Sequence, residues 1–228
     1  MPVTEPSRKQ PPRTGLEGKT AAVTATRGPL AAACAAVLAE RGARTSVLGD
    51  ADAVPPDLDV LVAIFDGAGL PLPAGPDAAD GEWEDAVGRA GQRLYRVARQ
   101  ATAAMHERGR GAIVVVAPLA GIVGIRGASI VAGAAGALFA SARTLAIEYA
   151  PTVRINLIAY GCVEGDPFSD WLRTTDPNRT QELDETLTLL ERLAHPNEVA
   201  TAAAFLGSDR ASFVVAHQLI VDGGYLVR

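Results

Sequence analysis

Short runs of small and β-branched apolar residues recur along this chain, and helix-forming segments follow several of them. The run Thr20–Thr24 precedes a turn and an alanine-rich segment, residues 30–41, which Gly42 ends. Residues 60–65 are all apolar, as expected for a parallel strand buried on both faces. This alternation predicts an α/β fold with a parallel sheet. The other expected strands are 45–48, 113–116, 153–158 and 219–221, and the other expected helices are 82–108, 131–149 and 197–206.

The connection between the second and third expected strands is unusually short. Only eleven residues separate Leu48 from Val60, and Pro55 and Pro56 interrupt them. A parallel crossover with its own helix needs a dozen residues or more, so we expect one helix–strand unit to be missing here. We expect residues 1–14 to form a disordered tail and residues 15–228 to form a single domain.

Composition limits the classes of partner and the location of the protein. The formal net charge is −5 and the pI is about 5.3, which argues against a nucleic-acid partner. The sequence has neither a signal-peptide core nor an apolar run near the roughly 20 residues of a membrane span. We therefore expect a cytoplasmic protein with no membrane partner, and we expect Cys34 and Cys162 to be reduced, buried thiols.

Three segments carry a more specific pattern. In the first segment, residues 16–24 read LEGKTAAVT and residues 38–43 read LAERGA. In the second, residues 154–156 read RIN and are followed by GCVE at residues 161–164. The third, residues 192–224, includes RLAHPNEVA, FLGSD and VDGG. Together they resemble the short-chain dehydrogenase/reductase family over about residues 15–228. The resemblance implies a Rossmann-like, doubly wound parallel sheet flanked by helices, a nicotinamide cofactor and an Asn–Ser–Tyr–Lys catalytic tetrad.

The glycine-rich cofactor motif of that family is altered in this chain. Its pattern, Thr-Gly-x-x-x-Gly-x-Gly, places Ala25, Pro29 and Ala31 at the three glycine positions. The glycines allow a tight turn and a close approach of the pyrophosphate, and proline also removes a backbone donor. Asp50 lies one place late for the ribose-binding acid, and residues 63–66 read AIFD where the family has Asn-Asn-Ala-Gly. We therefore predict that this chain binds no nicotinamide cofactor, although the turn retains Gly28 and loops can rearrange.

The tetrad positions are altered as well. Ala90 replaces the asparagine, Pro118 the serine, Val131 the tyrosine and Ala135 the lysine. A positioned acid or base contributes roughly 10²–10⁴-fold to rate, and none of these side chains can transfer a proton. The resemblance therefore predicts a degenerate member of the family that does not catalyse by the family's mechanism on its own.

These replacements lead to a hypothesis about assembly. We predict a non-catalytic subunit that pairs, as a dimer or tetramer, with an active NAD(P)-dependent short-chain dehydrogenase or ketoreductase of bacterial secondary metabolism, such as antibiotic biosynthesis. NAD(P) is then expected only in the partner, and residues 161–190 are expected to contribute to the partner's substrate pocket. The expected interface residues are Gly136, Phe139, Arg143, Tyr225 and Leu226.

Two alternatives remain open. Tyr160 replaces the proline that precedes Gly161 in the family pattern, and with Asp66, Glu164 and Arg126 it is a candidate to line the cleft. These residues would suit a cofactor-independent lyase or isomerase. The other alternative is a sensor that binds a nucleotide or small molecule without converting it. No histidine has a second ligand at a spacing typical of zinc sites.

Overall fold

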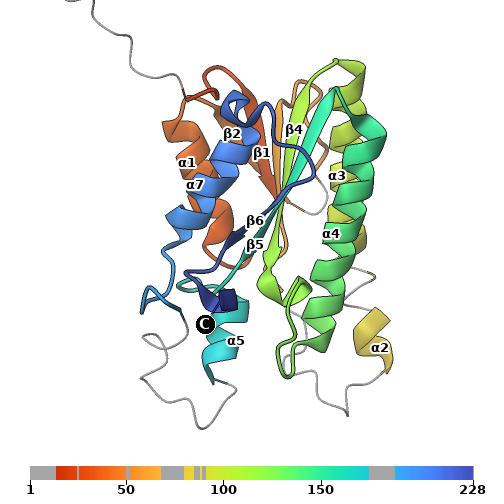
Figure 1. Cartoon of the computed structure of the whole chain (residues 1–228). Helices are drawn as coiled ribbons and strands as arrows, with labels where there is room; N and C mark the ends of the chain where they lie inside the picture. The colour runs from red at the N-terminus through yellow and green to blue at the C-terminus, as the bar shows by residue number, and fades with distance from the viewer. Residues whose placement is uncertain are drawn as a thin grey trace, which may run out of the picture.

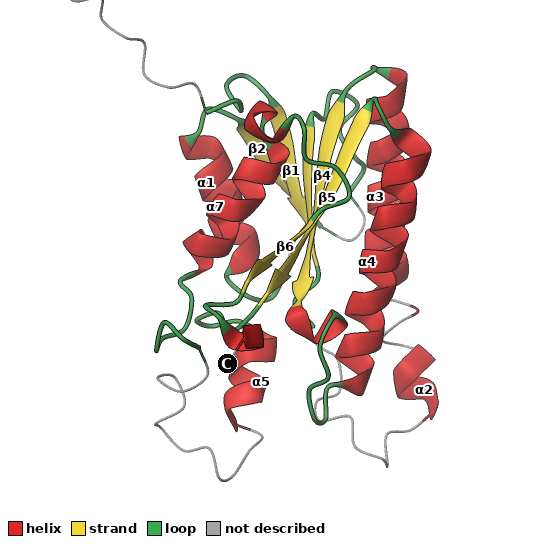
Figure 2. Cartoon of the chain, in the orientation of Figure 1, coloured by secondary structure: helices red, strands yellow, loops and turns green. Residues whose placement is uncertain are grey.

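A parallel sheet with helices on both faces forms the centre of the molecule (Figures 1 and 2). The structure is a computed structural model that describes residues 14–24, 26–49, 52–67, 80–84, 88, 91–174 and 188–227. All but Thr14 of the predicted tail lie outside the described residues. Within them, six parallel strands lie in the order β2-β1-β3-β4-β5-β6, which confirms the predicted Rossmann-like α/β fold. The strands are β1 (Thr20–Thr24), β2 (Arg44–Leu48), β3 (Val60–Ile64), β4 (Gly111–Pro118), β5 (Val153–Tyr160) and β6 (Gln218–Val221).

Two pairs of helices cover the two faces of the sheet. Helices α1 and α7 lie together on one face, and α3 and α4 lie together on the other (Figure 1). The predicted helix 82–108 corresponds to α2 and α3, and part of the segment between them lies outside the described residues. The helices are α1 (Leu30–Glu40), α2 (Asp80–Trp83), α3 (Gly91–Glu107), α4 (Ser129–Tyr149), α5 (Pro167–Thr174) and α7 (Pro196–Gly207).

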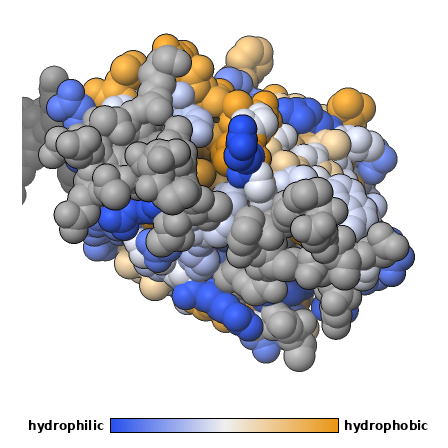
Figure 3. Space-filling model, turned by 90° about the horizontal axis from the view of Figure 1, so that it is seen from below, coloured by the Kyte–Doolittle hydropathy of each residue, from blue (hydrophilic) through white to orange (hydrophobic). Residues whose placement is uncertain are grey.

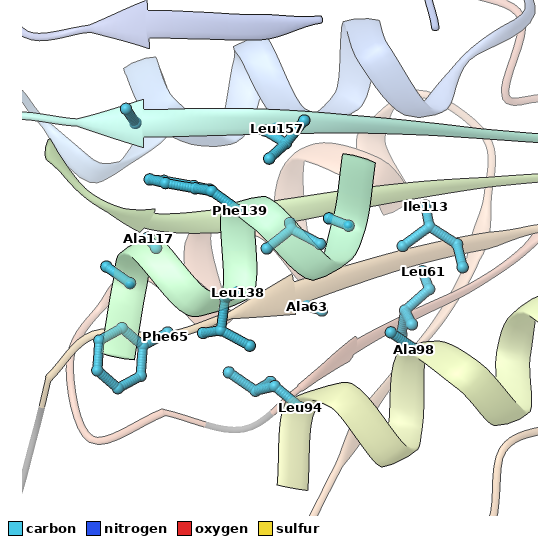
Figure 4. Close-up of a cluster of buried hydrophobic side chains, with 14 of the residues drawn as sticks. Leu61, Ala63, Phe65, Leu94, Ala98, Ile113, Ala117, Leu138, Phe139 and Leu157 are labelled. Atoms are coloured by element: carbon cyan, nitrogen blue, oxygen red, sulfur yellow. The ribbon is translucent and has the colours of Figure 1, made fainter. Parts of the chain in front are cut away.

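The larger core cluster lies between the sheet and the α3–α4 layer. Figure 4 shows Leu94 and Ala98 of α3 and Leu138 of α4 directed toward strand residues. Removing a side chain the size of leucine from water stabilises a fold by about 1.5–3 kcal/mol, so these contacts hold the layer to the sheet. The labelled strand and strand-end residues of this cluster are Leu61, Ala63, Phe65, Ile113, Ala117 and Leu157.

Glycines in α4 and in the segment after β4 let this helix and other parts of the chain approach closely. A Cβ added to Gly121 would lie 2.9 Å from Phe139 Cε2, and one added to Gly133 would lie 2.3 Å from the Trp83 ring. Phe139 is only 1% exposed. The chain itself therefore covers the Phe139 ring, and the contact of Phe139 with a partner stays a prediction.

Helix α4 is also long and apolar enough to cross a membrane by length and composition alone. Half of the most apolar stretch of this helix is buried inside the protein. Val131, Ala135 and Ala142 of this helix belong to the core cluster on the sheet. The apolar composition of α4 is therefore that of a core helix.

The short connection after β2 shapes the sheet. No helix or strand occurs in the described part of the segment between β2 and β3, as the spacing predicts. Strand β2 is consequently an edge of the sheet. The chain places β2 on one side of β1 and β3 on the other, so the strand order reverses at β1. Open α/β sheets bind ligands beside such a reversal, at the carboxyl ends of the strands.

Candidate functional site

The carboxyl ends of β1 and β3 lie side by side at the reversal of strand order. Thr24, the last residue of β1, accepts a hydrogen bond at its Oγ1 from the backbone N–H of Ile64 at 2.8 Å. This side chain continues the ladder where the backbone pairing between the strands ends. It fixes the turn before α1 relative to the residues that follow β3.

Asp66 follows β3 and reaches that turn. Its side chain is buried, with 7% of the residue exposed. Asp66 Oδ2 accepts hydrogen bonds from the backbone N–H groups of Arg27 at 3.0 Å and Gly28 at 3.2 Å. Thr26 Oγ1 donates to the Gly28 carbonyl oxygen at 3.0 Å and closes the turn. Two backbone donors thus converge on one carboxylate in front of α1.

A second buried carboxyl group lies beside the first. The Tyr160 hydroxyl donates to Asp166 Oδ1 at 3.0 Å, and Asp166 Oδ2 accepts from the backbone N–H of Ser169 at 3.0 Å and from Ser169 Oγ at 2.9 Å. Burial raises the pKa of Asp166 to about 6, with the charge of Asp66 adding to the rise. Burial, followed by the charges of Asp166 and Asp66, raises the pKa of Tyr160 well above 10. Tyr160 is therefore protonated at neutral pH.

The loop between β5 and α5 covers the turn before α1. A Cβ added to Gly28 would lie 2.9 Å from Pro167 Cδ, and one added to Gly165 would lie 3.8 Å from Pro29 Cγ. The turn and the loop are therefore in van der Waals contact. Figure 3 views the molecule from this edge, where hydrophobic and hydrophilic residues lie side by side on the described surface.

The tetrad positions on α4 are packed by other parts of the chain. Val131 and Ala135 are both 0% exposed. A Cβ added to Gly67 would lie 3.6 Å from Val131 Cγ2, and one added to Gly121 would lie 2.8 Å from Ala135 Cβ. Longer side chains at positions 131 and 135 would need these glycine-containing loops to move.

The structure brings together only part of the predicted site. Asp66 and Tyr160 meet at Asp166, whereas Glu164 and Arg126 are exposed. Ala25, Asp50 and Ala90 lie outside the described residues. Sequence reasoning missed Asp166, although an acid before proline at the start of a helix is a recognised capping signal.

The other predicted interface residues have mixed surroundings. Gly136, Tyr225 and Leu226 are partly buried, and Arg143 is exposed and bonds Gln218 Oε1. Their contact with a partner stays a prediction.

Other candidate ligand sites have a structural explanation. Both cysteines are buried and neither forms a disulfide, and burial raises the pKa of Cys34 to about 12. A cavity of about 450 Å³ at the amino ends of the strands includes Lys19 and Arg110, but Lys19 pairs with Asp209, and Arg110 with Asp59 at 3.3 Å. Among the residues that the structure describes, no group of three or more His, Cys, Asp or Glu could hold a metal.

Comparisons with known proteins assign the fold to a family. Residues 48–226 match the family described as Enoyl-(Acyl carrier protein) reductase. Cyclopentanol dehydrogenase of Comamonas sp. is 31% identical over 78% of this chain and 70% of its own length. Galactitol 2-dehydrogenase (L-tagatose-forming) of Cereibacter sphaeroides is 33% identical over 87% of this chain and 77% of its own length.

A solved structure supports the same assignment. The protein assigned as an NAD(P) dependent gluconate 5-dehydrogenase from Beutenbergia cavernae superposes with a TM-score of 0.80 at 26% identity. The superposition covers 95% of this chain and all of that one, whose crystal structure holds NADP at low occupancy.

These findings correct two predictions made from the sequence. We expected a non-catalytic subunit and no bound nicotinamide cofactor, but the relatives are dehydrogenases and the structural neighbour holds NADP. The predictions gave too much weight to single motif positions such as Pro29 and Val131. The strand order, with its reversal at β1, is retained around those positions, and a dinucleotide binds at such a reversal in folds of this kind.

The sequence match, the two relatives and the superposition all cover most of the chain. The six-stranded parallel sheet agrees with the fold of the solved neighbour. This chain therefore belongs to the short-chain dehydrogenase/reductase family.

Proposed function

We propose that this protein is an NAD(P)-dependent oxidoreductase that interconverts a secondary alcohol and a ketone. One observation carries the proposal: the N–H groups of Arg27 and Gly28 converge on an anion, the Asp66 carboxylate, at the reversal of strand order. Such a turn before a helix is the part of a doubly wound fold that binds phosphate groups. The nicotinamide cofactor would supply or accept the hydride.

The relatives support the substrate class. Cyclopentanol carries a secondary hydroxyl group, and galactitol is oxidised at its second carbon. The match with this chain spans more than two thirds of the length of each of these two relatives. A small molecule with a secondary hydroxyl group, or the matching ketone, is therefore the first substrate class to test.

We also propose that this chain lacks the acid–base residues that transfer the proton in other members of the family. Val131 and Ala135 occupy the positions of the tyrosine and lysine, and both are buried. A missing acid–base group lowers a rate by roughly 10²–10⁴-fold. We therefore propose a degenerate active site and expect turnover slower, by about that factor, than in relatives with the intact tetrad.

The described conformation does not fit a bound dinucleotide. The turn's two convergent N–H groups already contact Asp66, and Pro167 packs over Gly28. Binding therefore requires the Asp66 carboxylate and the loop after β5 to move.

Binding and turnover test the proposal directly. NADPH and NADH are titrated into the protein by fluorescence, and dinucleotide reduction is followed with cyclopentanol and galactitol. We expect saturable binding and slow turnover. Gly28→Val should weaken binding, because a branched side chain on the turn would hinder the close approach of a pyrophosphate to its N–H groups. Gly81→Ala should leave binding unchanged, because a Cβ at Gly81 would meet no atom within 4 Å. Absence of both binding and turnover would overturn the proposal.

We also propose a family partner and a cytoplasmic location. An exposed apolar side chain on α4, Ile147 (78% exposed), and Tyr95 on α3 (43% exposed) support assembly through this layer with a short-chain dehydrogenase homologue as a dimer or tetramer. The acidic net charge of −5 supports a protein without a nucleic-acid partner. Bacterial secondary metabolism remains our proposed setting.

A further inference from the structure

The Asp66 carboxylate lies where the phosphates of a dinucleotide are expected. In a doubly wound fold, the pyrophosphate binds backbone N–H groups at the first strand–turn–helix junction. Here Arg27 and Gly28 donate their N–H groups to Asp66 Oδ2 at 3.0 and 3.2 Å. Carboxylate and phosphate are both anionic acceptors that form strong, charge-assisted hydrogen bonds with such donors. They cannot use the same two donors at once.

The fold holds Asp66 close to these donors. Strand β3, which leads to Asp66, pairs directly with β1, and Thr24 bonds Ile64 at the end of the pair. An acceptor tethered in this way has a high effective concentration at the turn. Asp66 is 7% exposed as a residue, so bulk water competes little for its hydrogen bonds.

The loop after β5 completes the closed arrangement. A Cβ added to Gly28 would lie 3.7 Å from both Asp66 Oδ2 and Asp166 Cα, and 2.9 Å from Pro167 Cδ. Gly28 therefore lies between Asp66 on one side and the start of α5 on the other. A ligand that takes the two N–H groups must move both.

We propose that Asp66 is an internal competitor of the cofactor: its carboxylate occupies the phosphate-binding N–H groups of the turn, and a dinucleotide binds by displacing it. Asp66 therefore sets the cofactor affinity of this chain. The inference rests on the proposed function, because it takes the dinucleotide as the natural ligand of the turn.

A pair of charge-matched variants tests the proposal. D66N preserves the size of the side chain and removes its charge. E164Q removes the same charge from an exposed position of the covering loop. In NADPH titrations at constant ionic strength, we expect D66N to bind about tenfold tighter than the unmodified protein, the change in affinity that about 1.4 kcal/mol produces. We expect E164Q to bind within about twofold of it, as is usual for an exposed charge.

Each outcome decides one of the two proposals. If both proteins bind NADPH and D66N binds no tighter, Asp66 is no competitor. If neither binds any dinucleotide, the proposed function fails, and titration with inorganic pyrophosphate decides the inference separately. If D66N binds pyrophosphate and the unmodified protein does not, the inference about Asp66 is supported. If neither protein binds pyrophosphate, that inference is overturned. Circular dichroism checks folding, and D66G replaces D66N if that variant does not fold.

Discussion

At the scale of single residues, the Asp166 carboxyl group links the fold to pH. Its pKa is about 6 in the folded protein against 3.8 for an unperturbed group, so the folded chain binds this proton more tightly than the unfolded chain. The free energy of unfolding should therefore fall as the pH rises from about 4 to 6, by on the order of 3 kcal/mol from this group. Above that range the group adds no further change.

Two substitutions isolate this contribution. D166N should remove the fall in unfolding free energy between pH 4 and 6, measured by urea unfolding at several pH values. Y160F removes the hydroxyl that donates to Asp166 but leaves the acid in place, so the fall should remain. An unchanged pH profile in D166N would assign it to another group.

At the scale of secondary-structure elements, the packing of α4 depends on Gly121. A Cβ at this position would lie 2.8 Å from Ala135 Cβ, 2.9 Å from Phe139 Cε2 and 3.0 Å from the Ala135 backbone. Because one of these atoms belongs to the Ala135 backbone, the close contact can be relieved only if α4 or the loop containing Gly121 shifts. G121A should lower the free energy of unfolding by about 1–3 kcal/mol, the usual effect of overpacking.

The same loop offers a matched control. A Cβ at Gly124 meets no atom within 4 Å, so G124A should change stability by less than about 0.5 kcal/mol. Equal effects in chemical unfolding of the two variants would show that the close approach at Gly121 does not matter.

The elements themselves could be predicted from sequence more readily than their contacts. Hydrophobic runs and capping signals located the strands and most helix ends, because these depend on neighbouring residues. The Asp66 hydrogen bonds to Arg27 and Gly28 join residues nearly 40 positions apart, which periodicity does not detect. The burial of Phe139 was not predicted for the same reason, because its cover comes from the loop containing Gly121.

At the scale of the whole molecule, the α3–α4 layer is the surface to test for assembly. Ile147 is 78% exposed on α4, and an aspartate there would place a charge in an interface core, where charged residues are depleted. I147D should reduce the molar mass measured by light scattering, alone or after co-expression with a short-chain dehydrogenase homologue. F213S, at an equally apolar and fully exposed position outside this layer, should not. If the unmodified protein, I147D and F213S have the same molar mass, both alone and after co-expression, assembly through this face is contradicted.

The loss of a helix–strand unit also leaves the outer backbone groups of β2 without a neighbouring strand among the described residues. Such edges tend to recruit strands from other molecules unless the strand is short or polar. Strand β2 has five residues, and Arg44, Thr45 and Ser46 are polar, with Val47 as its exposed apolar side chain. The shortened sheet thus ends in a strand that is a poor template for aggregation, although it has no neighbouring strand on its outer side among the described residues.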